Sequence, residues 1–146
     1  MKVRPAALIV REGAVLTMRY RYGSGYVHVL PGGNPDPGES LPDALCRELA
    51  EELGIDVVVG NMVLVGEVLR FRGREDTLHC IFSADIGSSD PVLDRANTSA
   101  EAIEWISAGK LGDINLYPNF ASRLTGNILA GELSYTGPLS QPYVGD

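Results

Sequence analysis

Residues 33–55, "GNPDPGESLPDALCRELAEELGI", join a loop rich in proline and glycine to an acidic segment. The prolines and glycines before Glu39 disfavour regular structure, which predicts a structured loop. Ser40 predicts a helix N-cap, because the Leu-Pro-Asp that follows it places a proline and an acid in the first turn. Gly54 is typical of a C-terminal stop, so we expect one helix that ends near Leu53.

Three glutamates share one face of this predicted helix. Successive helical residues are about 100° apart, so Glu48, Glu51 and Glu52 fall within an arc of about 100°. The small side chain of Ala44 would leave the surface between them open. The other side is apolar, which predicts packing on the core. It holds Leu45, Cys46, Leu49, Ala50 and Leu53.

Two interpretations of the acidic face are open. Glutamate favours helices, so a solvated face is the simple one. Against it, Arg47 is the only cation of the segment, and the glutamates lie in the C-terminal half, where the helix dipole disfavours negative charge. Divalent cations would compensate that charge, because Mg²⁺ prefers oxygen ligands and usually takes one or two carboxylates together with substrate phosphates.

The same stretch carries a resemblance to a known family. Gly33, Glu39 and the run "RELAEELGI" at residues 47–55 match the signature of the Nudix hydrolases at every specified position, and the preceding "LPGG" is also typical. The sequence therefore resembles a MutT-like Nudix hydrolase. This resemblance implies an α/β fold, namely an α/β/α sandwich around a mixed β-sheet, with a single domain over residues 1–146.

The resemblance also implies a reaction. It is the hydrolysis of the diphosphate linkage in a nucleoside diphosphate derivative or a nucleoside triphosphate, with Mg²⁺ or Mn²⁺ as the cofactor. Metal ions would neutralise the diphosphate and activate a water for attack on phosphorus, and a carboxylate would take the proton. The family pattern implies metal-facing carboxylates at Glu48, Glu51 and Glu52. It also implies a further ligand at the Gly32 carbonyl and an orienting role for Arg47.

Several residues outside the helix are implied as site residues. The general base is either a glutamate of the helix or Glu101 in a distant loop. Arg19 and Arg21 occupy positions where family members hold a substrate phosphate, although a solvent-facing cation suits either one equally well. His28 and Tyr117 lie near the presumed cleft and are candidate substrate contacts. A lone histidine is more often structural, and aromatic residues at strand spacing are usually in the core.

Three further residues are given structural interpretations. Glu39 is expected to steady the loop on the helix or to join the outer metal shell. Glu104 alternates with apolar neighbours, a pattern that predicts an exposed position on a strand. His79, in "TLHCIF", is predicted to be a structural histidine.

Composition limits the kinds of partner. Twelve Lys and Arg residues against nineteen Asp and Glu give a net charge of −7, which argues against nucleic acid or anionic membranes as partners. No run approaches the roughly 20 apolar residues that span a bilayer. Cys46 and Cys80 lack metal-ligand spacing and predict buried, reduced thiols. We therefore expect a cytoplasmic protein that acts on a small molecule. The family often forms homodimers, which one sequence does not test.

Other functions on the same fold are open. A non-catalytic nucleotide sensor would usually have lost signature glutamates, and all of them are present here. An isomerase of isopentenyl diphosphate would be longer and would use a cysteine in a different context. The sequence has none of the markers that would select a substrate within the family.

The remaining secondary structure is predicted from pattern. Strands are expected at residues 3–13 and 14–21, joined by a turn at residues 11–13, and at 26–30, 56–73, 74–86 and 102–107. The strand at 56–73 should break near Gly60 and Asn61. A polar loop is expected at 87–101, a closing helix at 118–133 and an irregular tail at 134–146.

Overall fold

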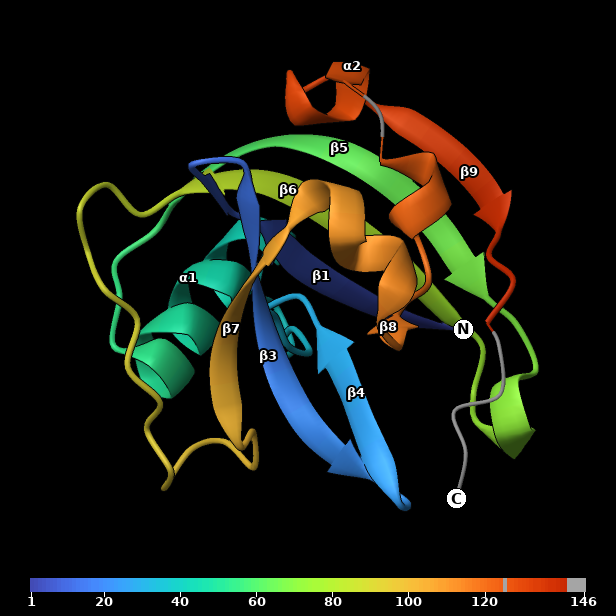
Figure 1. The fold of residues 1–146 in the computed structure, drawn as a ribbon, viewed down its shortest axis with the longest axis horizontal. Coiled ribbons are helices and arrows are strands. Elements are labelled where there is room, and N and C mark those ends of the chain that lie inside the picture. The colour runs from blue at the N-terminus through green and yellow to red at the C-terminus, as the bar shows by residue number, and fades with distance from the viewer. Residues whose placement is uncertain (125, 142–146) are drawn as a thin grey trace.

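The computed structural model describes residues 1–124 and 126–141, which form two β-sheets and one long helix, α1 (Leu41–Leu53) (Figure 1). Sheet A has the order β1 (Lys2–Leu8), β6 (Thr77–Asp85), β5 (Val58–Val68) and β9 (Ser134–Pro138). Sheet B has the order β2 (Val10–Arg11), β3 (Ala14–Tyr22), β4 (Gly25–Val29) and β8 (Leu116–Tyr117), and β7 (Ala102–Ser107) also pairs with β3. The short helices are α2 (Gly126–Leu129) and 3₁₀ helices at Phe71–Gly73, Ala108–Asp113 and Ala121–Arg123.

Sheet A is mixed and is covered on both faces. β1 pairs parallel with β6, and β5 pairs antiparallel with β6. Ala6 and Leu8 of β1 enter one hydrophobic core, whereas Ala7 and the following Ile9 enter the other. A strand buried on both faces needs a continuous apolar run, which explains "AALI" at residues 6–9.

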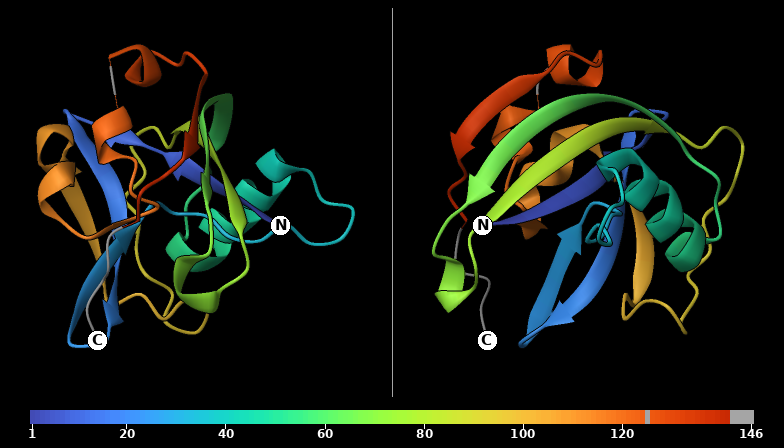
Figure 2. Two further views of the ribbon diagram at one scale, coloured as in Figure 1. Left: turned by 90° about the vertical axis from the view of Figure 1, so that its right-hand side faces the viewer. Right: turned by 180° about the vertical axis from the view of Figure 1, so that it is seen from behind.

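Helix α1 and the short helices lie on opposite faces of sheet A. Leu45, Leu49 and Leu53 of α1 belong to the core that contains Ala7. Residues of the short-helix region, including Leu111 and Ile128, belong to the core on the other face. Figures 1 and 2 show β5 and β6 arching over α1. The predicted mixed α/β fold is confirmed, with the second helical layer reduced to short helices.

Helix α1 begins and ends as predicted. The Oγ of Ser40 accepts a hydrogen bond from the backbone N–H of Asp43 at 3.2 Å. Gly54 has a φ of 64°, and its N–H bonds the carbonyl of Ala50 at 3.1 Å. Both caps depend on neighbouring residues only, so the sequence pattern was sufficient to predict them.

The faces of α1 differ from the prediction in three positions. Cys46 and Ala50 are exposed rather than in the core, and Ala44 is fully buried rather than open. The buried stripe is narrow because it follows the leucines at four-residue spacing, with Ala44 beside them against the sheet. Cys80 is buried as predicted, so the correction applies only to Cys46.

Three predictions of secondary structure were wrong. β1 does not form a hairpin with β3, because it joins the other sheet and only the short β2 turns back on β3. The closing helix expected at 118–133 is a 3₁₀ turn followed by α2, in a segment that contains Gly126 and Gly131. Part of the expected irregular tail is β9, which pairs with β5. Residues 142–146 of that tail lie outside the described residues. The break in β5 is confirmed, since its pairing with β6 shifts between Val59 and Met62.

Candidate active site

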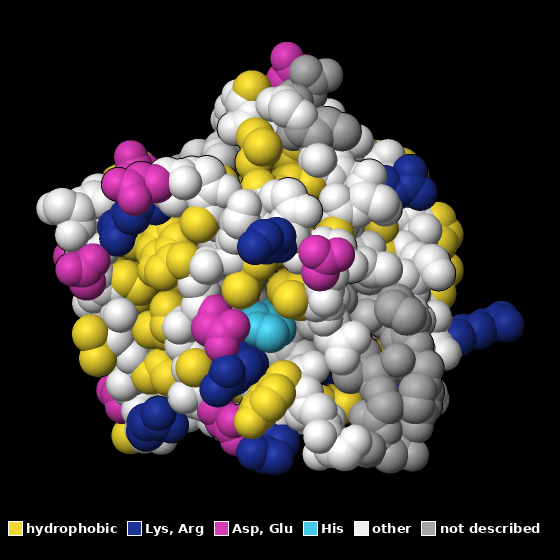
Figure 3. Space-filling model, viewed as in Figure 1, with side chains coloured by type: hydrophobic (Ala, Val, Ile, Leu, Met, Phe, Trp, Pro, Cys, Tyr) yellow, Lys and Arg dark blue, Asp and Glu magenta, His cyan; other side chains and the backbone are white. Residues whose placement is uncertain are grey.

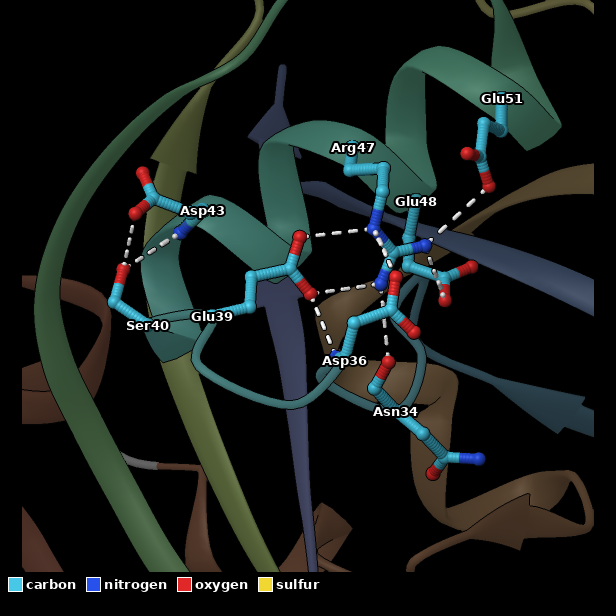
Figure 4. A network of polar contacts seen from close by, with 8 residues as sticks. All are labelled: Asn34, Asp36, Glu39, Ser40, Asp43, Arg47, Glu48 and Glu51. Carbon is cyan, nitrogen blue, oxygen red and sulfur yellow. Dashed lines mark hydrogen bonds and ion pairs between the residues drawn. The ribbon is translucent and has the colours of Figure 1, made fainter.

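Arg47 ties the loop of residues 33–40 to helix α1 (Figure 4). Its Nε and Nη2 donate to the two carboxylate oxygens of Glu39 at 2.8 and 2.9 Å. Its Nη2 also donates to the backbone carbonyl of Asn34, and its Nη1 reaches Glu48 at 3.1 Å and Glu51 at 3.4 Å. A planar guanidinium suits such a bidentate pair, so Arg47 fixes both the loop and the direction of the glutamates.

Glu39 holds its charge because of this pair. Its two hydrogen bonds from Arg47, and a third from the backbone N–H of Asp36, lower the pKa of Glu39 from its ordinary value of 4.5 to about 2. The same pairing raises the pKa of Arg47. Glu39 therefore steadies the loop on the helix.

We expect Glu39→Gln to change the acid limb of the stability curve. A carboxyl group whose pKa is depressed in the folded state stabilises the fold above its unfolded pKa, and that contribution is lost as the pH falls from about 4.5 to about 2. The variant should therefore have a lower melting temperature at pH 7 and a smaller loss between pH 5 and pH 3. Thermal unfolding across this range measures both effects. The exposed Glu12→Gln is the control, and identical pH profiles for Glu39→Gln and the wild type would contradict the prediction.

Glu52 experiences the repulsion that the helix geometry predicts. Burial first, and then the charge of Glu48, raise the pKa of Glu52 from 4.5 to about 7, with a smaller contribution from Glu51. Arg4 of β1 opposes this shift and is the cation that acts on Glu52. The carboxylates therefore share one electrostatic environment in which negative charge is incompletely compensated.

Two glycines let the loop pass close to α1 and to β1. A Cβ atom on Gly33 would lie 2.1 Å from the carboxyl carbon of Glu48, so this carboxyl group occupies the space that a side chain would take. A Cβ atom on Gly32 would lie 2.3 Å from the backbone oxygen of Pro5. The carbonyl of Gly32 accepts a hydrogen bond from Arg4 at 3.4 Å. The glycines thus bring the loop, the helix and β1 together at one place.

The donors at this place suit a divalent cation. Carboxylate and carbonyl oxygens are the ligands that Mg²⁺ and Mn²⁺ prefer, and a cation would relieve the repulsion by which Glu48 and Glu51 add to the raised pKa of Glu52. Within the described residues, no three His, Cys, Asp or Glu side chains converge as a complete metal shell, and Arg47 forms ion pairs with Glu48 and Glu51. The fit therefore rests on the chemistry of the donors.

A cleft adjoins this acidic site. It consists of two neighbouring cavities of about 440 and 430 Å³, each within the range of small-molecule sites. Arg4, Val29, Arg74 and Tyr117 line both cavities. The first cavity is further lined by Arg21 and by aromatic residues, namely Tyr20, Tyr22 and Phe71. Arginines beside aromatic rings provide contacts for an anionic group and for a flat ring.

The comparison with known families agrees with this geometry. The family model described as NUDIX domain matches residues 2–125. The chain belongs to the Nudix family.

Relatives of this Nudix chain carry the names of nucleotide hydrolases. It is 33% identical over 82 residues to the "Putative 8-oxo-dGTP diphosphatase" of Bacillus subtilis strain 168, a match that covers 56% of this chain and 51% of that protein. It is 42% identical over 60 residues to the CTP pyrophosphohydrolase of Escherichia coli K12, covering 40% and 44%. The matches thus span about half the length of these curated relatives.

A solved structure supports the MutT-like assignment. The MutT Nudix hydrolase from Burkholderia pseudomallei is 30% identical to this Nudix chain, with a TM-score of 0.64. The alignment covers 73% of this chain and 83% of that one.

Among the described residues, no helix has both the length and the apolar character to span a membrane.

Arg19 and His28 lie on the far face of sheet B from the cleft. Arg19 of β3 pairs in register with His28 of β4, and neither residue is among those that line the two cavities. The Nη1 of Arg19 donates to Glu104 at 2.6 Å, and the Nε2 of His28 lies 2.9 Å from the other oxygen of Glu104. Figure 3 shows acidic and basic side chains side by side on the face of the molecule that it draws. The structure therefore does not bring these two predicted substrate contacts to the cleft.

Glu104 is not the exposed strand residue that its sequence position predicted. Its side chain is 30% exposed, and it joins β3, β4 and β7 through Arg19 and His28. The hydrogen bond with His28, assisted by Arg19, lowers the pKa of Glu104. Its partners are on two other strands, so the pattern within β7 could not indicate them.

Arg21, Glu101 and Tyr117 lie at or next to the cleft. Arg21 and Tyr117 are among its lining residues. The Nε of Arg21 donates to Glu101 at 3.2 Å, which holds this carboxylate beside the cleft and leaves it 35% exposed. The structure thus places the predicted loop glutamate next to a lining residue.

Sequence reasoning missed three residues of the cleft: Arg4, Arg74 and His79. Arg4 and His79 are partners in the parallel pairing of β1 with β6. The sequence pattern indicated only that each of them lies in a strand, on the opposite face from its apolar neighbours. The strand pairing that brings them together could not be read from either segment alone.

Proposed function

We propose that this chain hydrolyses the diphosphate linkage of a nucleoside triphosphate or a nucleoside diphosphate derivative, with Mg²⁺ or Mn²⁺. The observation that carries the proposal is the position of Arg4, which lines both cavities of the cleft and bonds the carbonyl of Gly32, next to the Gly33 that packs on Glu48. Arg4 also links the cleft to Glu52 electrostatically. Its charge lowers the pKa of Glu52, which burial and Glu48 raise. A diphosphate with an attached nucleoside suits this arrangement, because its negative charge matches cations and arginines and its flat base matches the aromatic rings.

The acidic face provides the metal donors. Glu48, Glu51, Glu52 and the carbonyl of Gly32 would hold the cations, which would neutralise the diphosphate and activate a water. Arg47 would keep Glu48 and Glu51 directed toward the site through its contacts at 3.1 and 3.4 Å. With metal bound, Arg47 would retain Glu39 as its bidentate partner, and Glu48 and Glu51 would be able to turn to the cations.

The arginines of the cleft would hold the phosphates. Arg4 and Arg74 line both cavities, and Arg21 lines the cavity that contains Tyr20 and Tyr22. Cations placed there would orient the diphosphate in line for displacement at phosphorus, which is the main requirement for phosphoryl transfer. Tyr22 and Tyr117 offer rings for stacking on a base.

The proton acceptor has two candidates. The first is a glutamate of the acidic face that the cations would leave free to accept the proton. Glu101 is the second, and it would have to leave Arg21 to reach the attacking water. Glu101→Gln distinguishes them, since a large loss of turnover in that variant would favour Glu101.

A substrate panel tests the proposed function. The panel contains CTP, 8-oxo-dGTP, the common nucleoside triphosphates, ADP-ribose and a dinucleoside polyphosphate, each with Mg²⁺, with Mn²⁺ and with a chelator. We expect turnover of at least one nucleotide with either metal, read as phosphate released by a coupled phosphatase, and none with the chelator. Nucleotide binding without turnover of any member would favour the non-catalytic sensor, and turnover in the chelator would contradict the metal requirement.

A further inference from the structure

We infer that His79 is a specificity-determining residue that hydrogen-bonds the nucleobase in the cleft. This inference rests on the proposed function and deepens it, because it names the part of the ligand that the second cavity would recognise. The ligand edge must offer both a hydrogen-bond donor and an acceptor, as the amide-like edges of nucleobases do.

His79 is a buried polar side chain that makes no hydrogen bond within the described part of the chain. It is 1% exposed, and neither of its ring nitrogens has a hydrogen-bond partner among the described residues. Buried polar groups are nearly always paired, because a buried donor or acceptor left unpaired has lost its hydrogen bonds to water without replacement. Both ring nitrogens of His79 are buried without a hydrogen bond among the described residues. A ligand that bonds both of them would explain this arrangement.

The position of His79 suits a ligand that begins at the acidic helix. His79 of β6 pairs in register with Arg4 of β1, and both side chains line the cavity of about 430 Å³. Arg4 in turn acts on Glu52 of α1. Neighbouring strands are about 4.8 Å apart, so a nucleotide with its phosphates near Arg4 could place its base beside His79.

The surroundings of His79 suit a flat, neutral group. The ring of Tyr117 meets the ring of His79 edge-on, with centroids 5.3 Å apart, and Tyr117 lines both cavities. Phe71 lies 5.8 Å from Tyr117, which extends the aromatic surface. A base can enter this space by packing on Tyr117, which brings its edge toward the histidine.

The charge state of His79 supports the same ligand chemistry. Burial, followed by the charge of Arg4, lowers the pKa of His79 to about 4. A neutral imidazole has one N–H donor and one acceptor nitrogen. It is therefore complementary to an edge with one acceptor and one donor, and phosphate binding is left to the arginines.

Two substitutions of His79 test the inference. His79→Leu removes both polar atoms at comparable volume, whereas His79→Gln keeps a donor and an acceptor. The dissociation constants of CTP, UTP, ATP and GTP are measured by calorimetry for the wild type and both variants, together with kcat and KM. Tripolyphosphate, which has the charge but no base, is the control ligand.

We expect the wild type to discriminate among the four bases by at least about 10-fold, which is the usual effect of one well-placed hydrogen bond. His79→Leu should reduce the ratio to about twofold, and His79→Gln should restore part of it. Tripolyphosphate binding should change little, whereas KM for the preferred nucleotide should rise. The ligand-free melting temperature of His79→Leu should rise, because the two unpaired atoms are removed, whereas a merely structural histidine would make it fall.

The outcomes separate this inference from the proposed function. Unchanged base discrimination in His79→Leu, or its absence in the wild type, would overturn the role of His79 even if nucleotides are hydrolysed. An equal loss of tripolyphosphate and nucleotide affinity would also overturn it, since the variant would then have damaged the whole cleft. Loss of base discrimination in a protein that binds nucleotides without turnover would support the role of His79 and refute the hydrolase.

Discussion

Glu52→Gln should lower kcat/KM for the best nucleotide by about 10³-fold. Glutamine has the same shape as glutamate but lacks the charge that holds a metal ion, and metal ions provide several kcal/mol of transition-state stabilisation. The measurement is Mg²⁺-dependent turnover of the substrate that the panel selects, across a range of metal concentrations. Full Mg²⁺-dependent turnover in a normally folded variant would refute the proposed mechanism.

The stability of this variant should show that it is folded. The pKa of Glu52 is raised to about 7, so ionisation destabilises the fold as the pH rises from about 4.5 through 7. Without metal at pH 8, Glu52→Gln should therefore melt no lower than the wild type. Mg²⁺ should raise the melting temperature of the wild type only, because ligand binding stabilises the native state. The matched control is Glu132→Gln, the same change at an exposed position after α2.

The contacts of Arg47 explain how an acidic face can exist before metal binds. Glu39 neutralises Arg47 through two short hydrogen bonds, and the remaining Nη1 contacts Glu48 and Glu51 more loosely. Arg47 therefore partly compensates these two glutamates, whereas the charge of Arg4 acts on Glu52. Burial is the main cause of the raised pKa of Glu52, and the charges of Glu48 and Glu51 add to it.

Local features of the site could be predicted from the sequence, because they depend on residues within a few turns of one another. The caps at Ser40 and Gly54 follow from backbone requirements at those positions. The common face of Glu48, Glu51 and Glu52 follows from helical geometry alone. The prediction that Cys46 is buried was wrong for the opposite reason. The width of the buried stripe depends on the sheet on which α1 packs, and that sheet is formed by distant residues.

Features that depend on long-range strand pairing could not be predicted. The pairing of β1 with β6 places Arg4 beside His79, and the pairing of β5 with β9 converts an apparently irregular tail into a strand. The same limit applies to Arg19. Its place in β3 could be read from the sequence, but its position relative to the cleft could not. The family resemblance supplied the fold and the glutamates, and the cleft residues specific to this chain required the structure.

Gly33→Ala should abolish most activity without unfolding the protein, whereas Gly32→Ala should destabilise it. The Cβ that the first substitution adds would lie 2.1 Å from the Glu48 carboxyl carbon, and this end of a flexible side chain can move away. Moving a catalytic group by about an ångström can cost roughly 100-fold in rate, so we expect about that loss in kcat/KM with an unchanged melting temperature.

The contrast with Gly32 makes the prediction specific. A Cβ there would lie 2.3 Å from the Pro5 carbonyl oxygen and 2.8 Å from the Ala6 Cα, which are backbone atoms of β1 and cannot move without the sheet. Overpacking of this kind costs about 1–3 kcal/mol, or several degrees in melting temperature. Gly109→Ala is the control, since a Cβ at Gly109 meets nothing within 4 Å. Normal kcat/KM in a stable Gly33→Ala protein would mean that the Glu48 carboxylate is not required where the loop holds it.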